Sequence, residues 1–202
     1  MNSKVHEAVG MATTLAVMHP NKLEALVLGV PLILIGSIIP DIDCNSDSKT
    51  KQYFRKTVLW CVIIALIAIF INLGVMKITG VNVRGHLNHN ILVKLIGFAI
   101  FMCICGFGYN RPHREFTHSF VGVVIFTVPV MLMVGFKMSL YFMFAMLSHV
   151  LIDLLNTKGE SLLFPLKNKY CFNVCKASST TSNYIGAAAS IITIMELYLI
   201  AI

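Results

Sequence analysis

The chain has 202 residues, of which 57% are hydrophobic and only 12% are charged. Soluble domains carry about 25% charged residues, and about 18 consecutive apolar residues are enough to span a bilayer. Such stretches recur along the whole sequence, which excludes a soluble globular domain. The excess of 16 Lys and Arg over 9 Asp and Glu does not indicate nucleic-acid binding, because the basic residues lie in short connectors between apolar runs.

The apolar runs predict an all-α fold, a polytopic transmembrane helical bundle, because backbone polar groups in lipid must pair within their own segment. The first run, Val5–Met18, is too short to cross alone at about 1.5 Å per residue, and we expect it to be a short N-terminal helix of the mature protein. About six full-length helices are predicted to follow, at Leu23–Ile39, Val58–Met76, Ile91–Tyr109, Ser119–Phe136, Ser139–Asn156 and Tyr184–Ile202. Residues 1–202 are predicted to form a single integral membrane domain.

The connectors on the two sides of the bundle differ in charge. When the crossings alternate from the short helix onward, eleven Lys and Arg residues fall on the side of the N-terminus and five on the other. Basic residues favour the cytoplasmic side of a membrane. We therefore expect the N-terminus and the connectors 44–57, 110–118 and 157–183 to lie at the cytoplasmic face.

Two carboxylates end the first full-length segment, in Pro40-Asp41-Ile42-Asp43. They directly follow a proline that ends the helix, so both can turn toward one point, and carboxylate oxygens suit divalent cations. The alternative is an ordinary polar helix terminus, although a carboxylate at a helix C-terminus opposes the helix dipole. We predict that Asp41 and Asp43 are metal ligands.

A dense polar run, His113-Arg114-Glu115-Phe116-Thr117-His118-Ser119, opens the fourth segment. His118 is predicted to be a metal ligand. His113 is a ligand, a surface histidine, or a group that hydrogen-bonds to a ligand. Thr117 or Ser119 is expected to cap the following helix. The planar guanidinium of Arg114 suits a phosphate group.

Two further clusters carry imidazoles. His149 and Asp153 lie four residues apart and therefore share one helix face, where they form either a chelating pair for a metal or a buried His–Asp hydrogen bond without one. His6, beside Glu7 on the short helix, would in isolation be an ordinary histidine near a terminus. The alternating topology brings all four clusters to the same side, which predicts one recessed site.

These motifs resemble the YdjM-like family of inner-membrane proteins, which are regarded as metal-dependent hydrolases. The matching pieces run in family order, and together they cover nearly the whole chain: His6…Gly10, Gly36…Pro40-Asp41-Ile42-Asp43, His113–Ser119, His149–Asp153 and Asn156-Thr157-Lys158-Gly159…Pro165. The resemblance implies a plasma-membrane location and divalent metal binding, with His6 added to the ligands. A more distant similarity to zinc-dependent phospholipase C implies phosphoester substrates. This sequence lacks the additional histidines of a three-zinc site, so we expect one or two ions.

Together these features predict a membrane-embedded metal-dependent hydrolase that acts on a phosphoester or lipid-like anionic substrate at the cytoplasmic face, among membrane lipids. Zn²⁺ is the expected ion, with Mn, Fe or Mg as alternatives. Arg114 would bind the anionic group, and His113 or a carboxylate would take the proton. The predicted metal ligands are His6, Asp41, Asp43, His118, His149 and Asp153. The alternatives are a non-catalytic metal-binding membrane protein and an ion- or proton-coupled transporter, because intramembrane His and Asp also mark ion pathways.

Overall fold

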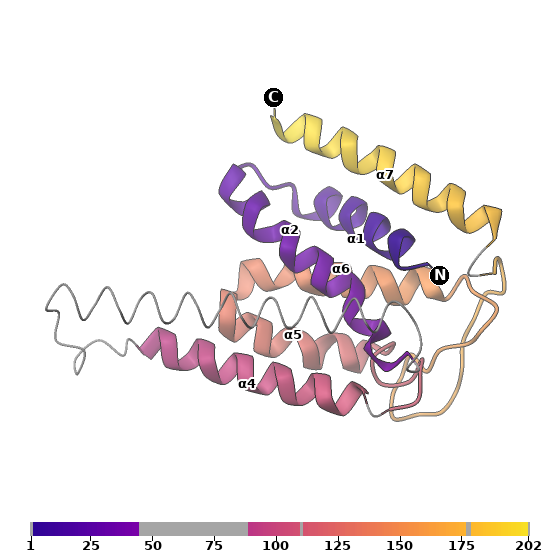
Figure 1. Ribbon diagram of the computed structural model, residues 1–202, viewed down its shortest axis with the longest axis horizontal. Coiled ribbons are helices and arrows are strands. Elements are labelled where there is room, and N and C mark those ends of the chain that lie inside the picture. Colours follow the sequence, from indigo (N-terminus) through magenta and orange to yellow (C-terminus); the bar gives the residue numbers. More distant parts are fainter. Residues whose placement is uncertain (1, 45–88, 110, 177–178, 202) are drawn as a thin grey trace, which may run out of the picture.

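The computed structural model describes residues 2–44, 89–109, 111–176 and 179–201, and the regular elements in these ranges are all helical (Figure 1). The all-α prediction is therefore confirmed for this part of the chain, while the predicted helix Val58–Met76 lies outside it. The elements are α1 (Ser3–Met18), α2 (Leu23–Ile38), a 3₁₀ turn η1 (Ile39–Asp43), α4 (His89–Tyr109), α5 (Phe120–Val134), α6 (Phe136–Asp153) and α7 (Thr180–Ala201).

The helix boundaries differ from the predicted ones mainly at α6 and α7, and α7 begins at Thr180 rather than at Tyr184. Gly135 has a φ of 86° and alone separates α5 from α6, so α6 begins at Phe136 rather than at Ser139. It ends at Asp153 because the amides after Leu154 no longer donate four residues back: Leu155 N donates to the Ile152 carbonyl and Asn156 N to the Asp153 carbonyl, each three residues back. Ser119 caps α5 as predicted, since its hydroxyl oxygen accepts a hydrogen bond from Gly122 N at 2.9 Å.

Three of the described helical segments are long and apolar enough to cross a membrane, namely Leu23–Asp43, Phe136–Asp153 and Thr180–Ile200. Val93–Tyr109 and Phe120–Val134 are apolar but shorter, so the number of crossings stays a prediction. Helix α7 exposes large apolar side chains such as Ile191, Ile194 and Leu199. A continuous apolar surface of this kind is unfavourable in water and suits contact with lipid.

Helix α6 is the central element of the bundle. It packs against α1, α2 and α5, while α7 lies on the outer side of α1 and α4 on the outer side of α5 (Figure 1). Its side chains enter two buried apolar clusters, one through Phe142 and Met146 and the other through Tyr141 and Ala145. The start of α1, the turn η1, the connector before α5 and the end of α6 all gather at one end of the bundle, and the polar clusters lie there.

The contact between α2 and α6 depends on Gly36. A β-carbon at this position would lie 2.5 Å from the Phe142 carbonyl oxygen and 3.1 Å from Ala145 Cβ. We expect Gly36→Ala to lower the free energy of unfolding by about 1–3 kcal/mol, because the two helices must separate. Thermal unfolding in detergent checks this. Gly106→Ala is the control, since a β-carbon there meets no atom within 4 Å, and an equal loss in both variants would contradict the prediction.

Candidate metal centre

His149, on α6, is held by the backbone of α2. The ring is fully buried, and its Nδ1 lies 2.6 Å from the Ser37 carbonyl oxygen. A carbonyl only accepts hydrogen bonds, so Nδ1 carries the proton and Nε2 keeps a lone pair. Nε2 lies 3.7 Å from Asp41 Oδ1 and has no hydrogen-bond partner within the described part of the chain. Histidines that bind metals are commonly oriented in this way, by a backbone carbonyl at the other ring nitrogen.

His118, in the connector before α5, is oriented through Thr117. The Thr117 hydroxyl donates to Asp43 Oδ2 at 2.6 Å, so it accepts from His118 Nδ1 at 3.1 Å. His118 Nε2 again has no hydrogen-bond partner among the described residues. It lies 3.8 Å from Asp41 Oδ1 and 3.9 Å from Asp153 Oδ2. Two buried imidazoles from different parts of the chain thus direct a free nitrogen toward the same carboxylate, Asp41.

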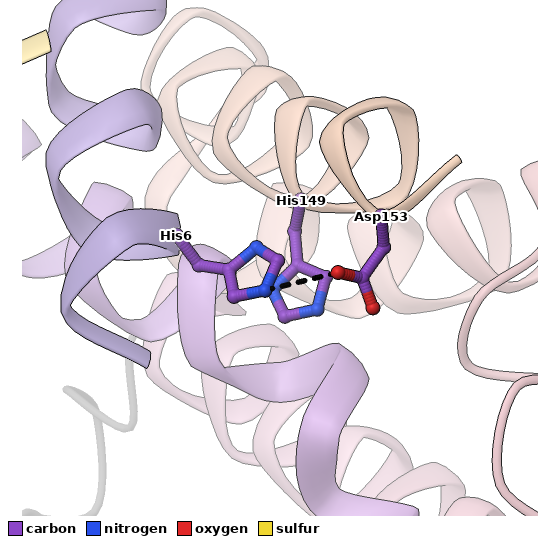
Figure 2. A group of neighbouring side chains, drawn as sticks. All are labelled: His6, His149 and Asp153. Carbon is purple, nitrogen blue, oxygen red and sulfur yellow. Dashed lines mark ion pairs between the residues drawn. The ribbon is translucent and has the colours of Figure 1, made fainter. Parts of the chain in front are cut away.

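His6 joins the centre from α1, where its side chain is almost fully buried. Its ring stacks on that of His149, with 3.7 Å between the centroids and an interplanar angle of 12°. His6 Nε2 lies 3.2 Å from Asp153 Oδ1, and Figure 2 shows the two imidazoles and the carboxylate meeting between α1 and α6. The structure therefore brings together a histidine and a pair of helical residues that are more than 140 positions apart in the sequence.

Asp43 and His113 lie beside the central group, at its more exposed side. Asp43 Oδ1 accepts from His113 Nδ1 at 2.7 Å, and Asp43 Oδ2 accepts from Arg114 N at 3.2 Å as well as from Thr117. His113 is 33% exposed, and the half-buried Cys44 thiol lies 3.5 Å from its Nδ1. The ligand role of Asp43 stays a prediction, and these contacts give it a positioning role for His113 and Thr117.

Arg114 contacts other residues of the protein. It has a φ of 68°, in the left-handed region that only a few per cent of non-glycine residues adopt. Its buried guanidinium lies 2.7 Å from Asp153 Oδ2 through Nη2 and donates to the Lys158 carbonyl through Nη1. It therefore orients Asp153 and ties α6 to the connector that follows. Its predicted role as an anion clamp stays a prediction.

Glu160 is a potential ligand that the sequence analysis does not identify. Its side chain is fully buried, and neither carboxylate oxygen has a hydrogen-bond partner in the described ranges. Ligand atoms of Glu160, His118 and Asp153 all lie within 4.8 Å of one another. Burial raises the pKa of Glu160 to about 8. The sequence offered one indication, because Glu160 directly follows Gly159 of the last motif. The connector has no helical or strand periodicity, however, so the sequence does not reveal where this side chain points.

The centre attracts positive charge. Burial alone would lower the pKa of His118, but Asp43, Glu160 and Asp41 raise it to about 9. When all four carboxylates are ionised, as metal ligands must be, and the imidazoles are neutral, the centre has a formal charge of −3 from Asp41, Asp43, Asp153, Glu160 and Arg114. A divalent ion is attracted by the same carboxylate charges and would displace the proton of His118. Imidazole nitrogens with carboxylate oxygens are a donor set of zinc sites, so the residues fit a divalent metal.

Thr117 offers a test of how His118 is oriented. Thr117→Val keeps the side-chain volume but removes the hydroxyl that links His118 to Asp43. We expect the metal affinity to fall by about 10–100-fold, as when the hydrogen-bond partner of a ligand is lost elsewhere, and competition with a chromogenic chelator measures it. Thr127→Val is the control, because that hydroxyl only donates to the Val123 carbonyl within α5. Equal affinity of the two variants would show that Thr117 does not hold His118.

Comparison with known proteins gives one family. A family model described as YdjM inner membrane protein matches residues 1–202 of the chain. Searches of curated proteins and of solved structures gave no match. The family match covers all five motifs named above, and it confirms the resemblance that they carry.

Proposed function

Because the chain belongs to the YdjM family of inner membrane proteins, we propose that it is a membrane-embedded metal-dependent hydrolase. The observation that carries this proposal is the convergence of the unpartnered His118 Nε2 and His149 Nε2 on Asp41 Oδ1, at 3.8 and 3.7 Å. A purely structural His–Asp network would close these gaps to hydrogen bonds of about 2.7–3.2 Å. Ligand atoms around a tetrahedral metal ion each lie about 2.0–2.2 Å from the ion. Two such ligand atoms are therefore farther from each other than the two atoms of a hydrogen bond.

One or two divalent ions, with Zn²⁺ expected, would be held by the ligand groups of this centre, to which Asp41, His118, His149, His6 and Asp153 belong. Such an ion supplies Lewis acidity, which lowers the pKa of a water molecule toward neutrality. His113 is suited to take the proton. Its Nδ1 bonds to Asp43, which would stabilise the imidazolium, and its Nε2 makes two long contacts, at 3.4 Å from Arg114 Nε and 3.6 Å from the Cys44 thiol. Its partial exposure also lets the proton leave to water.

The surroundings favour an anionic, amphiphilic substrate. The apolar surfaces of α2, α4, α5 and α7 are exposed and suit lipid, so a substrate carrying an acyl chain can approach from the bilayer. Lys158 and Arg111 are exposed at the same end of the bundle and attract a phosphate group. We propose that this end, which also holds the N-terminus, faces the cytoplasm, in keeping with the excess of basic residues in its connectors.

The test is to purify the protein in detergent and measure bound metal by elemental mass spectrometry. Hydrolysis of an aryl phosphodiester and of phospholipid in mixed micelles is then followed before chelation, after chelation and after resupply of Zn²⁺. We expect at least one ion per chain and hydrolysis that disappears and returns with the metal. Metal without hydrolysis of either substrate would reduce the proposal to a non-catalytic metal site. If no metal binds even after resupply, the proposal of a metal-dependent hydrolase is wrong.

A further inference from the structure

We propose that Glu160, with His118 and Asp153, forms a second cation position, so that the centre holds two metal ions side by side. This inference rests on the metal binding of the proposed function. It adds a ligand that is not among those predicted from the sequence, and it fixes the number of ions at two.

The Glu160 side chain is buried and lacks a hydrogen-bond partner among the described residues. The carboxylate is 0% exposed, and neither oxygen accepts a hydrogen bond within the part of the chain that the structure describes. A buried carboxylate is strongly unfavourable unless a cation, a donor or a proton compensates it. His118, whose Nε2 is equally buried and equally unpartnered, belongs to the same group of possible ligands. Two unsatisfied metal-ligand atoms from different connectors therefore face a common position.

The backbone holds Glu160 in this place. Its N donates to the Tyr170 carbonyl and its carbonyl accepts from Tyr170 N, both at 2.9 Å. The next amide, Ser161 N, donates to the Arg114 carbonyl at 3.0 Å and so links the connector to the run that carries His118. Gly159 allows this approach, because a β-carbon there would lie 2.9 Å from Lys169 Cβ. These three backbone hydrogen bonds and the close approach at Gly159 indicate a preorganised ligand position.

Two carboxylates lie between the two halves of the centre. Asp153 presents Oδ1 to His6 at 3.2 Å and Oδ2 to His118 at 3.9 Å. Asp41 Oδ1 lies 3.7 Å from His149 and 3.8 Å from His118. His6 and His149 form one group of possible ligands with Asp153, and His118 and Glu160 form another with the same Asp153. A carboxylate shared by two ligand groups can hold a pair of ions at the spacing of about 3.5–4 Å that two-metal sites have.

The charge of the centre also favours two metal ions. With every carboxylate ionised, as metal binding requires, one divalent ion reduces the formal charge from −3 to −1, which still repels an anionic substrate. A second divalent ion makes it +1, which attracts a phosphate group. His118 has only one free ring nitrogen, so it can ligate only one ion through Nε2. Glu160 supplies the carboxylate that this ion needs in addition to the two shared ones.

Glu160→Gln tests the proposal, because it keeps the side-chain volume and removes the anionic ligand. The protein is stripped, titrated with Zn²⁺ and analysed by elemental mass spectrometry and chelator competition. We expect two ions per chain for the parent and one for the variant, with the affinity for the second ion reduced at least tenfold. Glu115→Gln, a half-buried carboxylate in the connector before α5 that belongs to none of the described ligand groups, is the control and should retain two.

The outcomes separate this inference from the proposed function. A parent that saturates at one ion, or a Glu160→Gln variant that still binds two, would overturn the second position and leave the hydrolase proposal standing. No ion in the parent would overturn both. Electron paramagnetic resonance of the Mn²⁺-loaded parent needs no variant: adjacent ions give a spin-coupled spectrum, whereas two isolated Mn²⁺ signals would contradict the arrangement even if the variant failed to fold.

Discussion

His149→Gln combined with Asp153→Asn is expected to remove the bound metal and to reduce hydrolysis to below about 1% of the parent. Both substitutions conserve volume and keep a hydrogen-bonding group at the positions that meet Ser37 and Arg114. They remove one imidazole and one carboxylate from the middle of the centre. Losing a partner that merely orients a ligand costs about 10–100-fold in metal affinity or activity, so the loss of two ligands should exceed that range.

The measurement pairs metal content with thermal unfolding of the metal-free protein. The metal-free variant should still unfold cooperatively, at a lower temperature than the parent because the buried Arg114 loses its charged partner. Zn²⁺ should raise the unfolding temperature of the parent alone, because an ion that binds only the native state stabilises it. His19→Ala with Glu24→Ala is the matched control, since it removes an exposed imidazole and an exposed carboxylate outside the centre. A variant that keeps its metal would show that His149 and Asp153 form only a structural hydrogen-bonded pair.

The centre was partly predictable from the sequence because its residues interrupt apolar runs. His149 and Asp153 are polar positions within an otherwise apolar helix, and a spacing of four residues places them on one face whatever the tertiary structure. Asp41 and His118 end or open such runs, and the alternation of crossings brings them to the same side. These predictions required only the length of each run and the number of crossings, which hydrophobicity determines.

The contacts between helices were not predictable in this way. The spacing of His6 and Gly10 places both on one face of α1, but the sequence does not reveal what that face meets. In the structure a β-carbon on Gly10 would lie 2.0 Å from Ser37 Oγ, so the glycine lets α1 approach the residue whose carbonyl holds His149. Glu160 could not be predicted for a related reason, since its direction depends on backbone bonds to Tyr170 in a connector without a period.

Arg114→Met is expected to lower the unfolding free energy of the metal-free protein by about 3–5 kcal/mol. The Arg114–Asp153 pair is buried on both sides, and removal of one partner leaves an uncompensated charge in a medium of low dielectric constant. Asp153 would then face Glu160 without a guanidinium nearby. Arg111→Met is the matched control: this arginine lies in the same connector and is exposed, with its guanidinium 4.3 Å from the Phe107 ring, so about 1 kcal/mol or less is expected.

Arg114→Lys separates the two roles open to this residue. If the guanidinium positions Asp153, the shorter, single-point contact of lysine misplaces the carboxylate, so the metal affinity falls and excess Zn²⁺ restores activity with KM near the parent value. If Arg114 instead binds the anionic group of the substrate, the metal affinity stays at the parent value and KM rises at every Zn²⁺ concentration. The contacts to Asp153 and to the Lys158 carbonyl occupy both terminal nitrogens of the fork. We therefore expect the first result, and a raised KM with intact metal affinity would contradict it.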